Sequence, residues 1–187
     1  MPKNLIRSIV LAVTLAGASV ASQAAPVTVT FNEAGAPVGQ LDGTTFYQSY
    51  GIANFTSAVR FGADSRLPDD GFGITNAPAA SAAVIFGEDI SALGMTWAVS
   101  GSGITFVAEL YDIADVLLET FSSGGVGLFG TASFSASNVR KVVFHDSGST
   151  VAIDTLTYTR GTVPEAATLA LVGLALAGAA VARRRKA

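Results

Sequence analysis

Carboxylates are the side chains of this sequence with the widest scope for chemistry. A glycoside hydrolase needs two of them facing one sugar, roughly 5–10 Å apart. Carboxylates at turns or alternating along strands also keep an exposed strand face soluble. A polysaccharide hydrolase with paired carboxylates is therefore the alternative function, and a non-enzymatic protein is the prediction. The acidic residues that the alternative would draw on are Glu88, Asp89, Glu109, Asp112, Asp115 and Glu119.

Histidine and cysteine restrict the remaining chemistry. His145 is the single histidine and the sequence contains no cysteine, so a Ser-His-Asp triad would have to use His145. The G-x-S-x-G nucleophile motif does not occur in the sequence. Common zinc sites need several nitrogen or sulfur ligands, which this composition does not supply. We therefore predict that His145 lies at a strand end or in a loop without a catalytic role.

The elements that must position these side chains read as strands. Short runs of β-branched and aromatic residues recur between turn formers such as DDGFG, SGSG and SSGG. Nine or ten such runs predict an all-β fold, an antiparallel two-sheet sandwich with jelly-roll-like topology. Apolar strands on either side of residues 112–115 predict a hairpin, and Trp97 is expected in the core.

The first 24 residues differ from this body. Lys3 and Arg7 precede an apolar run, and small residues follow it up to Pro26. This pattern is typical of a secretory signal peptide, a helix removed by a cut after Ala24. Export of a chain without cysteine means that apolar burial, and no disulfide, must stabilise the domain.

The other end carries a second apolar segment. Residues 166–182 contain no charge, and as a helix they would span about 25 Å. Four cations follow them, which predicts a C-terminal transmembrane helix with a cytoplasmic stop. The predicted organisation is signal peptide 1–24, β-sandwich domain 25–160 and membrane tail 161–187.

The charge of the body excludes one class of partner. Thirteen acidic residues and five basic ones lie between residues 25 and 160. Nucleic-acid binding requires clustered cations that neutralise phosphates. The basic residues of the body are too few and too scattered for that, so no nucleic-acid partner is expected.

The tail VPEAATLALVGLALAGAAVARRRK resembles the PEP-CTERM sorting tail of Gram-negative bacteria. Val163, Pro164 and Glu165 match its first motif, although Ala166 stands where the second proline is usual. The Arg-rich end of the tail comprises Arg183, Arg184, Arg185 and Lys186. The resemblance implies an exosortase-type membrane protease as partner, a transient inner-membrane tether, and release to the cell surface or the exterior. It also implies a link to exopolysaccharide and biofilm.

Two segments of the body, VTFNEAGAPVGQLDGTTFYQSYGIANF and VVFHDSGSTVAIDTLTYTR, are similar to the framing segments of PEP-CTERM β-sandwich proteins. Those sandwiches resemble galactose-binding-like domains, in which the first and last strands lie together and often hold a structural calcium. The resemblance suggests Glu33 and Asp154 as calcium ligands, because hard oxygen ligands suit this ion. Two solvent-facing carboxylates are the alternative. No other cofactor is expected.

The sequence therefore predicts an exported, non-enzymatic surface or matrix protein that binds carbohydrate. Aromatic side chains are the natural platforms for sugar rings. The tyrosines that could serve are Tyr47, Tyr50, Tyr111 and Tyr158.

Overall fold

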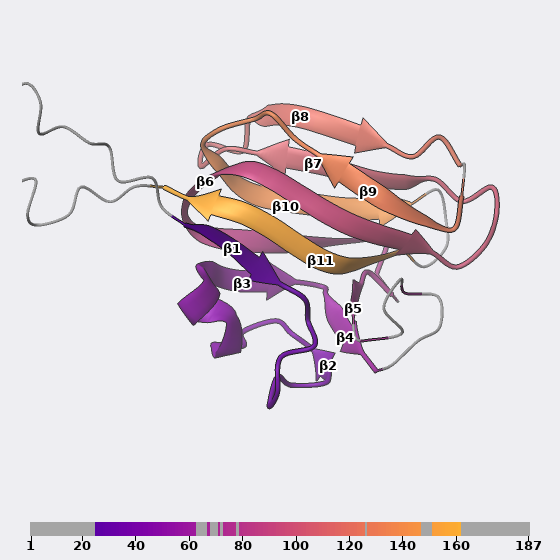
Figure 1. Cartoon of the computed structure of the whole chain (residues 1–187), viewed down its shortest axis with the longest axis horizontal. Helices are drawn as coiled ribbons and strands as arrows, with labels where there is room; N and C mark the ends of the chain where they lie inside the picture. The colour runs from indigo at the N-terminus through magenta and orange to yellow at the C-terminus, as the bar shows by residue number, and fades with distance from the viewer. Residues whose placement is uncertain are drawn as a thin grey trace, which may run out of the picture. The chain divides into compact units, whose positions relative to one another are not determined.

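The computed structural model describes residues 25–62, 67, 71, 73–77, 79–125, 127–146 and 151–161. The described part is built from antiparallel strands, which form one hydrogen-bonded sheet (Figure 1). Its elements are β1 (Pro26–Val29), β2 (Gly39–Gln40), the 3₁₀ helix η1 (Phe46–Tyr50), β3 (Ile52–Thr56), β4 (Val59–Phe61), β5 (Gly73–Thr75), β6 (Ser81–Val99), β7 (Phe106–Tyr111), β8 (Leu117–Ser122), β9 (Phe129–Ser133), β10 (Val139–Asp146) and β11 (Val151–Arg160).

The 19-residue strand β6 folds this sheet into two layers. Residues 81–85 of β6 pair with β10, and residues 94–98 pair with both β11 and β9. Between these parts the register shifts, and Ala92 has a positive φ of 50°. Such bulges bend a strand and increase its twist. As a result, β6 leaves one layer and enters the other.

The two layers follow from these pairings. Layer one contains the first part of β6 with β3, β10, β7 and β8. Layer two contains the second part of β6 with β9 and β11, and β1 and the β5–β4–β2 ribbon extend it from β11. This arrangement confirms the predicted all-β sandwich, with the difference that one long strand belongs to both layers.

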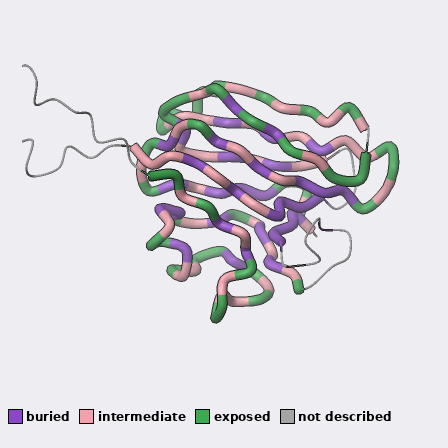
Figure 2. Tube along the Cα trace, viewed as in Figure 1, coloured by how far each residue is buried: buried purple, intermediate pink, exposed green. Residues whose placement is uncertain are grey.

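Apolar side chains of the two layers meet in a shared core. Trp97 of layer two stacks on Phe106 of layer one, with ring centroids 5.4 Å apart and planes 8° apart. A Cβ on Gly130 would lie 2.8 Å from Cζ2 of Trp97, so glycine is needed for β9 to cover this ring. Buried and intermediate residues alternate along β7, and Figure 2 shows buried segments on the strands of both layers. The predicted core position of Trp97 is thus confirmed.

Two segments of the structure differ from what their local sequence suggests. The runs AAVIF and LGMTWAV suggest two strands, but Gly87, Glu88 and Asp89 between them remain within β6. There Glu88 pairs with Arg160 of β11 and Asp89 pairs with Arg140 of β10. The aromatic run at 46–50 suggests a strand but forms η1. Gly51, with a φ of 92°, ends this helix before β3 begins.

Residues 25–161 form a compact unit with its own core, separate from the two terminal segments. The body therefore contains the core that it needs to fold by itself. The predicted signal peptide and transmembrane helix lie outside the described residues. Within the described part of the chain, no helix is long and apolar enough to span a membrane.

Candidate functional site

The outer face of β7 and β10 gathers polar side chains from two strands. Successive residues of a strand point to opposite faces, so Phe106, Ala108 and Leu110 enter the core while Glu109 and Tyr111 face outward. Lys141 is paired with Tyr111 in the register. His145 lies two register steps beyond the partner of Glu109, on the same side of β10. We call Glu109, Tyr111, Lys141 and His145 the β7–β10 face.

Glu109 organises this face. Its Oε2 accepts a 2.7 Å hydrogen bond from the Tyr111 hydroxyl and lies 4.0 Å from Nε2 of His145. The hydrogen bond to Glu109, more than desolvation, raises the pKa of Tyr111 above its ordinary value. Tyr111 therefore remains protonated and donates a hydrogen bond. Such a group can bind a ligand hydroxyl but is not a nucleophile.

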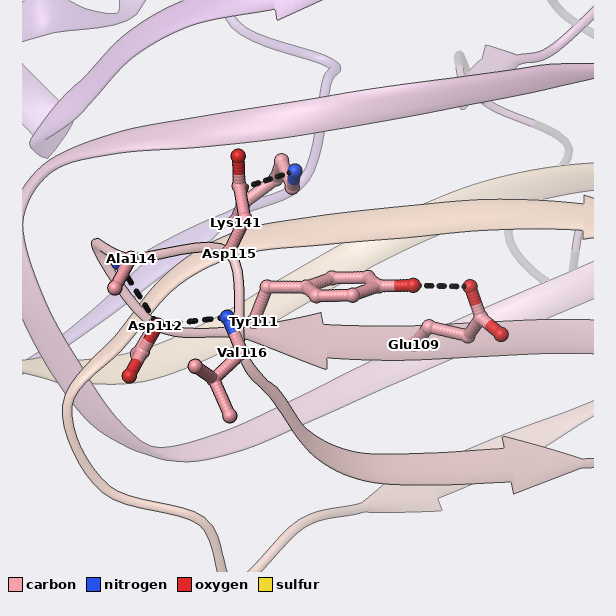
Figure 3. A network of polar contacts seen from close by, with 7 residues as sticks. All are labelled: Glu109, Tyr111, Asp112, Ala114, Asp115, Val116 and Lys141. Atoms are coloured by element: carbon pink, nitrogen blue, oxygen red, sulfur yellow. Dashed lines mark hydrogen bonds and ion pairs between the residues drawn. The ribbon is translucent and has the colours of Figure 1, made fainter.

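Lys141 covers the other end of the face (Figure 3). Its Nζ lies 4.7 Å from the centroid of the Tyr111 ring and 2.5 Å from Oδ1 of Asp115. The cation therefore occupies one side of the aromatic ring while it pairs with a carboxylate of the following turn. His145 is the residue before the end of β10, which agrees with its predicted position near a strand end.

Each of the remaining carboxylates of the hydrolase alternative has a structural contact. Glu88 pairs with Arg160, and Asp89 lies 2.6 Å from Nε of Arg140. Oδ1 of Asp112 accepts the backbone N–H of Ala114 and Val116 within its own turn. Oε2 of Glu119 accepts the backbone N–H of residues 135 and 136. These contacts give the carboxylates roles in the fold that require no catalysis.

The two predicted calcium ligands lie near a pair of neighbouring strands, and only Asp154 is part of a strand. β1 pairs with β11, as expected for the first and last strands, and Glu33 follows β1 while Asp154 lies within β11. Oε1 of Glu33 accepts the backbone N–H of Thr30 at 2.9 Å. Oε2 of Glu33 is buried and has no hydrogen-bond partner among the described residues. Such an oxygen fits a cation ligand.

The side chain of Arg60 contacts the 31–37 loop, which also contains Glu33. Its side chain is only 3% exposed, and its Nε and Nη1 donate 2.7 Å hydrogen bonds to the carbonyls of Phe31 and Ala36. Those carbonyls are therefore engaged by a guanidinium. Among the described residues, no group of three or more His, Cys, Asp or Glu side chains could hold a metal. Calcium at Glu33 and Asp154 stays a prediction.

Sequence reasoning did not detect this role of Arg60. Val59 and Phe61 flank Arg60 on a three-residue strand, and nothing in that pattern marks the arginine as the buried residue. The β7–β10 face had a weak signal, because Glu109 and Tyr111 alternate in ELYD. Its pairing with Lys141 depends on the strand register.

The tyrosines divide into two groups. Tyr47 and Tyr158 are buried, and desolvation is the main cause that raises their pKa well above the ordinary value. The Tyr158 hydroxyl donates to the carbonyl of Tyr50 at 2.7 Å. Tyr50 and Tyr111 remain partly exposed, so these two are the tyrosines that a ligand could reach.

Comparison with known proteins identifies the tail. Residues 162–186 match the PEP-CTERM protein-sorting motif. The match contains Val163, Pro164 and Glu165 and the four cations of 183–186, all of which lie outside the described residues. The predicted sorting motif is thus confirmed at the level of sequence. No curated protein matches the chain.

Solved structures similar to this chain include carbohydrate-binding modules. A family 6 module is 16% identical, with a TM-score of 0.39, over 59% of this chain and 88% of its own. The family 6 module CsCBM6-3 from Clostridium stercorarium, solved with cellobiose, is 16% identical over the same shares, with a TM-score of 0.37. The family 32 module of C. perfringens NanJ, solved with galactose, is 12% identical over 56% of this chain and 93% of its own, with a TM-score of 0.35. These are likenesses of fold, and no ligand or site follows from them.

Proposed function

We propose that this chain is a non-enzymatic surface or extracellular-matrix protein of a Gram-negative bacterium. The match of residues 162–186 to the PEP-CTERM sorting motif carries the proposal. Residues 1–24 direct export, and the apolar run 166–182 tethers the exported body to the inner membrane. An exosortase-type protease then cuts the tail, and the body passes to the cell surface or the exterior.

The sorting step is tested by separating the motif from the apolar run. Replacement of Pro164 and Glu165 by alanine leaves the hydrophobic segment intact, so membrane insertion is expected to be unchanged. The full-length tethered form should then accumulate in a host with exosortase. The control, Asp42→Ala, lies on the exposed surface of the body outside the matched residues and should be processed like the wild type. Equal processing of the motif variant and this control would contradict the proposal.

The membrane tether is tested by placing charged residues within the apolar run 166–182. Replacement of Leu171 and Leu174 by aspartate should cost several kcal/mol in membrane insertion, at about 2.5–3.5 kcal/mol for each central charge. The protein should then appear as a soluble exported form in cell fractionation. Retention of this variant in the membrane fraction would show that another segment holds it there.

For the body, we propose carbohydrate binding at the β7–β10 face, in connection with exopolysaccharide and biofilm. Support comes from the chemistry of the face, which presents the Tyr111 hydroxyl, the His145 imidazole and the Glu109 carboxylate on one side of a sheet. Sugar hydroxyls both donate and accept hydrogen bonds, and these groups match both needs. The structural contacts of the other carboxylates favour binding over hydrolysis.

A glycan array on residues 25–161 tests this assignment. Tyr111→Ala should weaken binding of any retained glycan at least tenfold, because the variant loses both the hydroxyl and the ring. Phe129→Ala is the control, since Phe129 is an exposed aromatic residue on β9, away from this face. Equal loss in both variants would reject the site. Release of reducing ends from a bound polysaccharide would establish the hydrolase alternative.

A further inference from the structure

The hairpin between β7 and β8 exposes an unusual group of aliphatic side chains. Ile113 is 74% exposed, Val116 56%, Leu117 50% and Leu118 38%. Single exposed apolar residues are common on soluble proteins, but a contiguous group marks a surface that contacts something apolar. We call these four residues the hairpin patch.

The hairpin patch is held in one conformation. Oδ1 of Asp112 accepts the N–H of Ala114 at 2.8 Å and that of Val116 at 2.9 Å (Figure 3). Asp115 adopts a positive φ of 61° and receives Nζ of Lys141. The turn is therefore preorganised with its apolar side chains outward, and their exposure does not reflect a loose loop.

The hairpin patch lies at the end of the sandwich where β11, the last strand before the tail, ends. Gly161 donates its N–H to the carbonyl of Asp89, and the Asp89 carboxylate binds Arg140. The next residue, Lys141, binds Asp115 in the hairpin turn. Figure 1 shows the turn from β7 to β8 and the end of β11 at the same end of the body.

Chain length limits the distance between this end and the apolar run. The run begins at Ala166, five residues after Gly161. An extended chain spans at most about 3.6 Å per residue, so the two residues lie within about 18 Å of each other. If the run is embedded in a bilayer, the end of the body that bears the hairpin patch must stay close to the lipid surface.

We infer that the hairpin patch dips into the lipid surface while the chain is tethered. This inference rests on the proposed tether. The patch supplies apolar side chains for the boundary between headgroups and acyl chains, where short apolar segments bind in proportion to their buried area. Arg140, Lys141 and Arg160 lie at the same end, but each pairs with a carboxylate there, so the contact depends on the apolar side chains and not on charge. Such weak contact needs the high effective concentration that a covalent tether provides. Cleavage of the tail by exosortase would therefore release the body from the membrane completely, although the hairpin patch remains on the body.

The test uses the full chain, which contains no cysteine of its own. Ile113→Cys is labelled with an environment-sensitive fluorophore and reconstituted through the tail into phosphatidylcholine–phosphatidylglycerol vesicles. The matched control is Leu128→Cys, an aliphatic position that is 52% exposed and lies at the opposite end of the strands from the tail. Its neighbour Phe129 pairs with Ala98 of β6, and Ala98 pairs with Ala152 of β11. Eight strand steps, or about 26 Å, separate Ala152 from Arg160 at the tail end.

A blue shift and strong quenching by spin-labelled lipid at position 113, with neither at 128, are the expected results. Leu117→Asp in the Ile113→Cys background should reduce the quenching severalfold while the protein still floats with the vesicles. Flotation without quenching at 113 would overturn the inference and leave the tether intact. A blue shift at 113 without lipid quenching would assign the patch to a second copy or another protein and also overturn it. Failure to float would overturn the tether and the inference together.

Discussion

Two polar regions of the body differ in their access to water, and this difference separates structure from function. Arg60 is buried and donates hydrogen bonds to carbonyls of the 31–37 loop. The β7–β10 face, in contrast, keeps its charged groups partly solvated, with the Lys141 and Glu109 side chains both 28% exposed. Removal of a desolvated charge leaves buried acceptors without donors, whereas removal of a solvated one exposes groups to water. The first region should therefore decide stability and the second should decide binding.

The largest effect is expected for Arg60→Met. The variant keeps most of the apolar stem but leaves the Phe31 and Ala36 carbonyls without their donor. We expect the free energy of unfolding of residues 25–161 to fall by about 3–5 kcal/mol in urea titrations. Arg140→Met is the control, because its ion pair with Asp89 is exposed and should be worth at most about 1 kcal/mol. Similar losses in both variants would break the comparison.

Calcium sharpens the comparison within the buried region. An ion held by Glu33 and Asp154 would bind only the folded state and raise its melting temperature. Excess chelator should then lower the melting temperature by several degrees, and Asp154→Asn should remove most of that response. If neither chelator nor added calcium changes the melting temperature, the calcium prediction is rejected. Arg60 would then be the cation that contacts the 31–37 loop, with no metal ion there.

Tyr47 predicts how the buried region responds to alkali. Desolvation, followed by the Glu33 charge, holds its folded pKa above the unfolded value of 10.0. The folded state therefore binds this proton more tightly, and the resulting stability is complete below pH 10 and declines as the pH rises above it. Tyr47→Phe should reduce this decline in unfolding titrations between pH 9 and roughly pH 11. Its buried hydroxyl has no hydrogen-bond partner among the described residues, so at pH 7 the variant should match or exceed the wild type by up to about 1 kcal/mol. An unchanged alkaline profile would contradict the burial of this hydroxyl.

The smallest effect on stability is expected at the β7–β10 face. Tyr111→Phe removes the hydrogen bond to Glu109 but keeps the ring and its contact with Lys141. Because the bond is partly solvated, the free energy of unfolding should change by less than about 0.5 kcal/mol. Glycan affinity should nevertheless fall, which isothermal titration with an array-identified glycan would measure. A variant that loses stability and keeps affinity would reverse the roles of the two regions.

The sequence predicted the features that depend on local pattern. Alternation and turn residues located the hairpin at 112–115, and an apolar neighbourhood placed Trp97 in the core. Register and burial are properties of the whole fold, so the contact of Lys141 with Tyr111 and the buried position of Arg60 were not predictable. The bend in β6 was missed for the same reason, since it depends on the pairing of one strand with β10 and then with β11 and β9, which are distant in the sequence.

The most direct test of the sorting function is the mass of the protein recovered from the surface of a host that carries exosortase. Removal of the signal peptide predicts a body that begins at Ala25, and a cut at the motif predicts that this body has lost the terminal RRRKA sequence. Recovery of a surface protein with RRRKA intact would contradict the sorting function and leave a plain membrane anchor in its place.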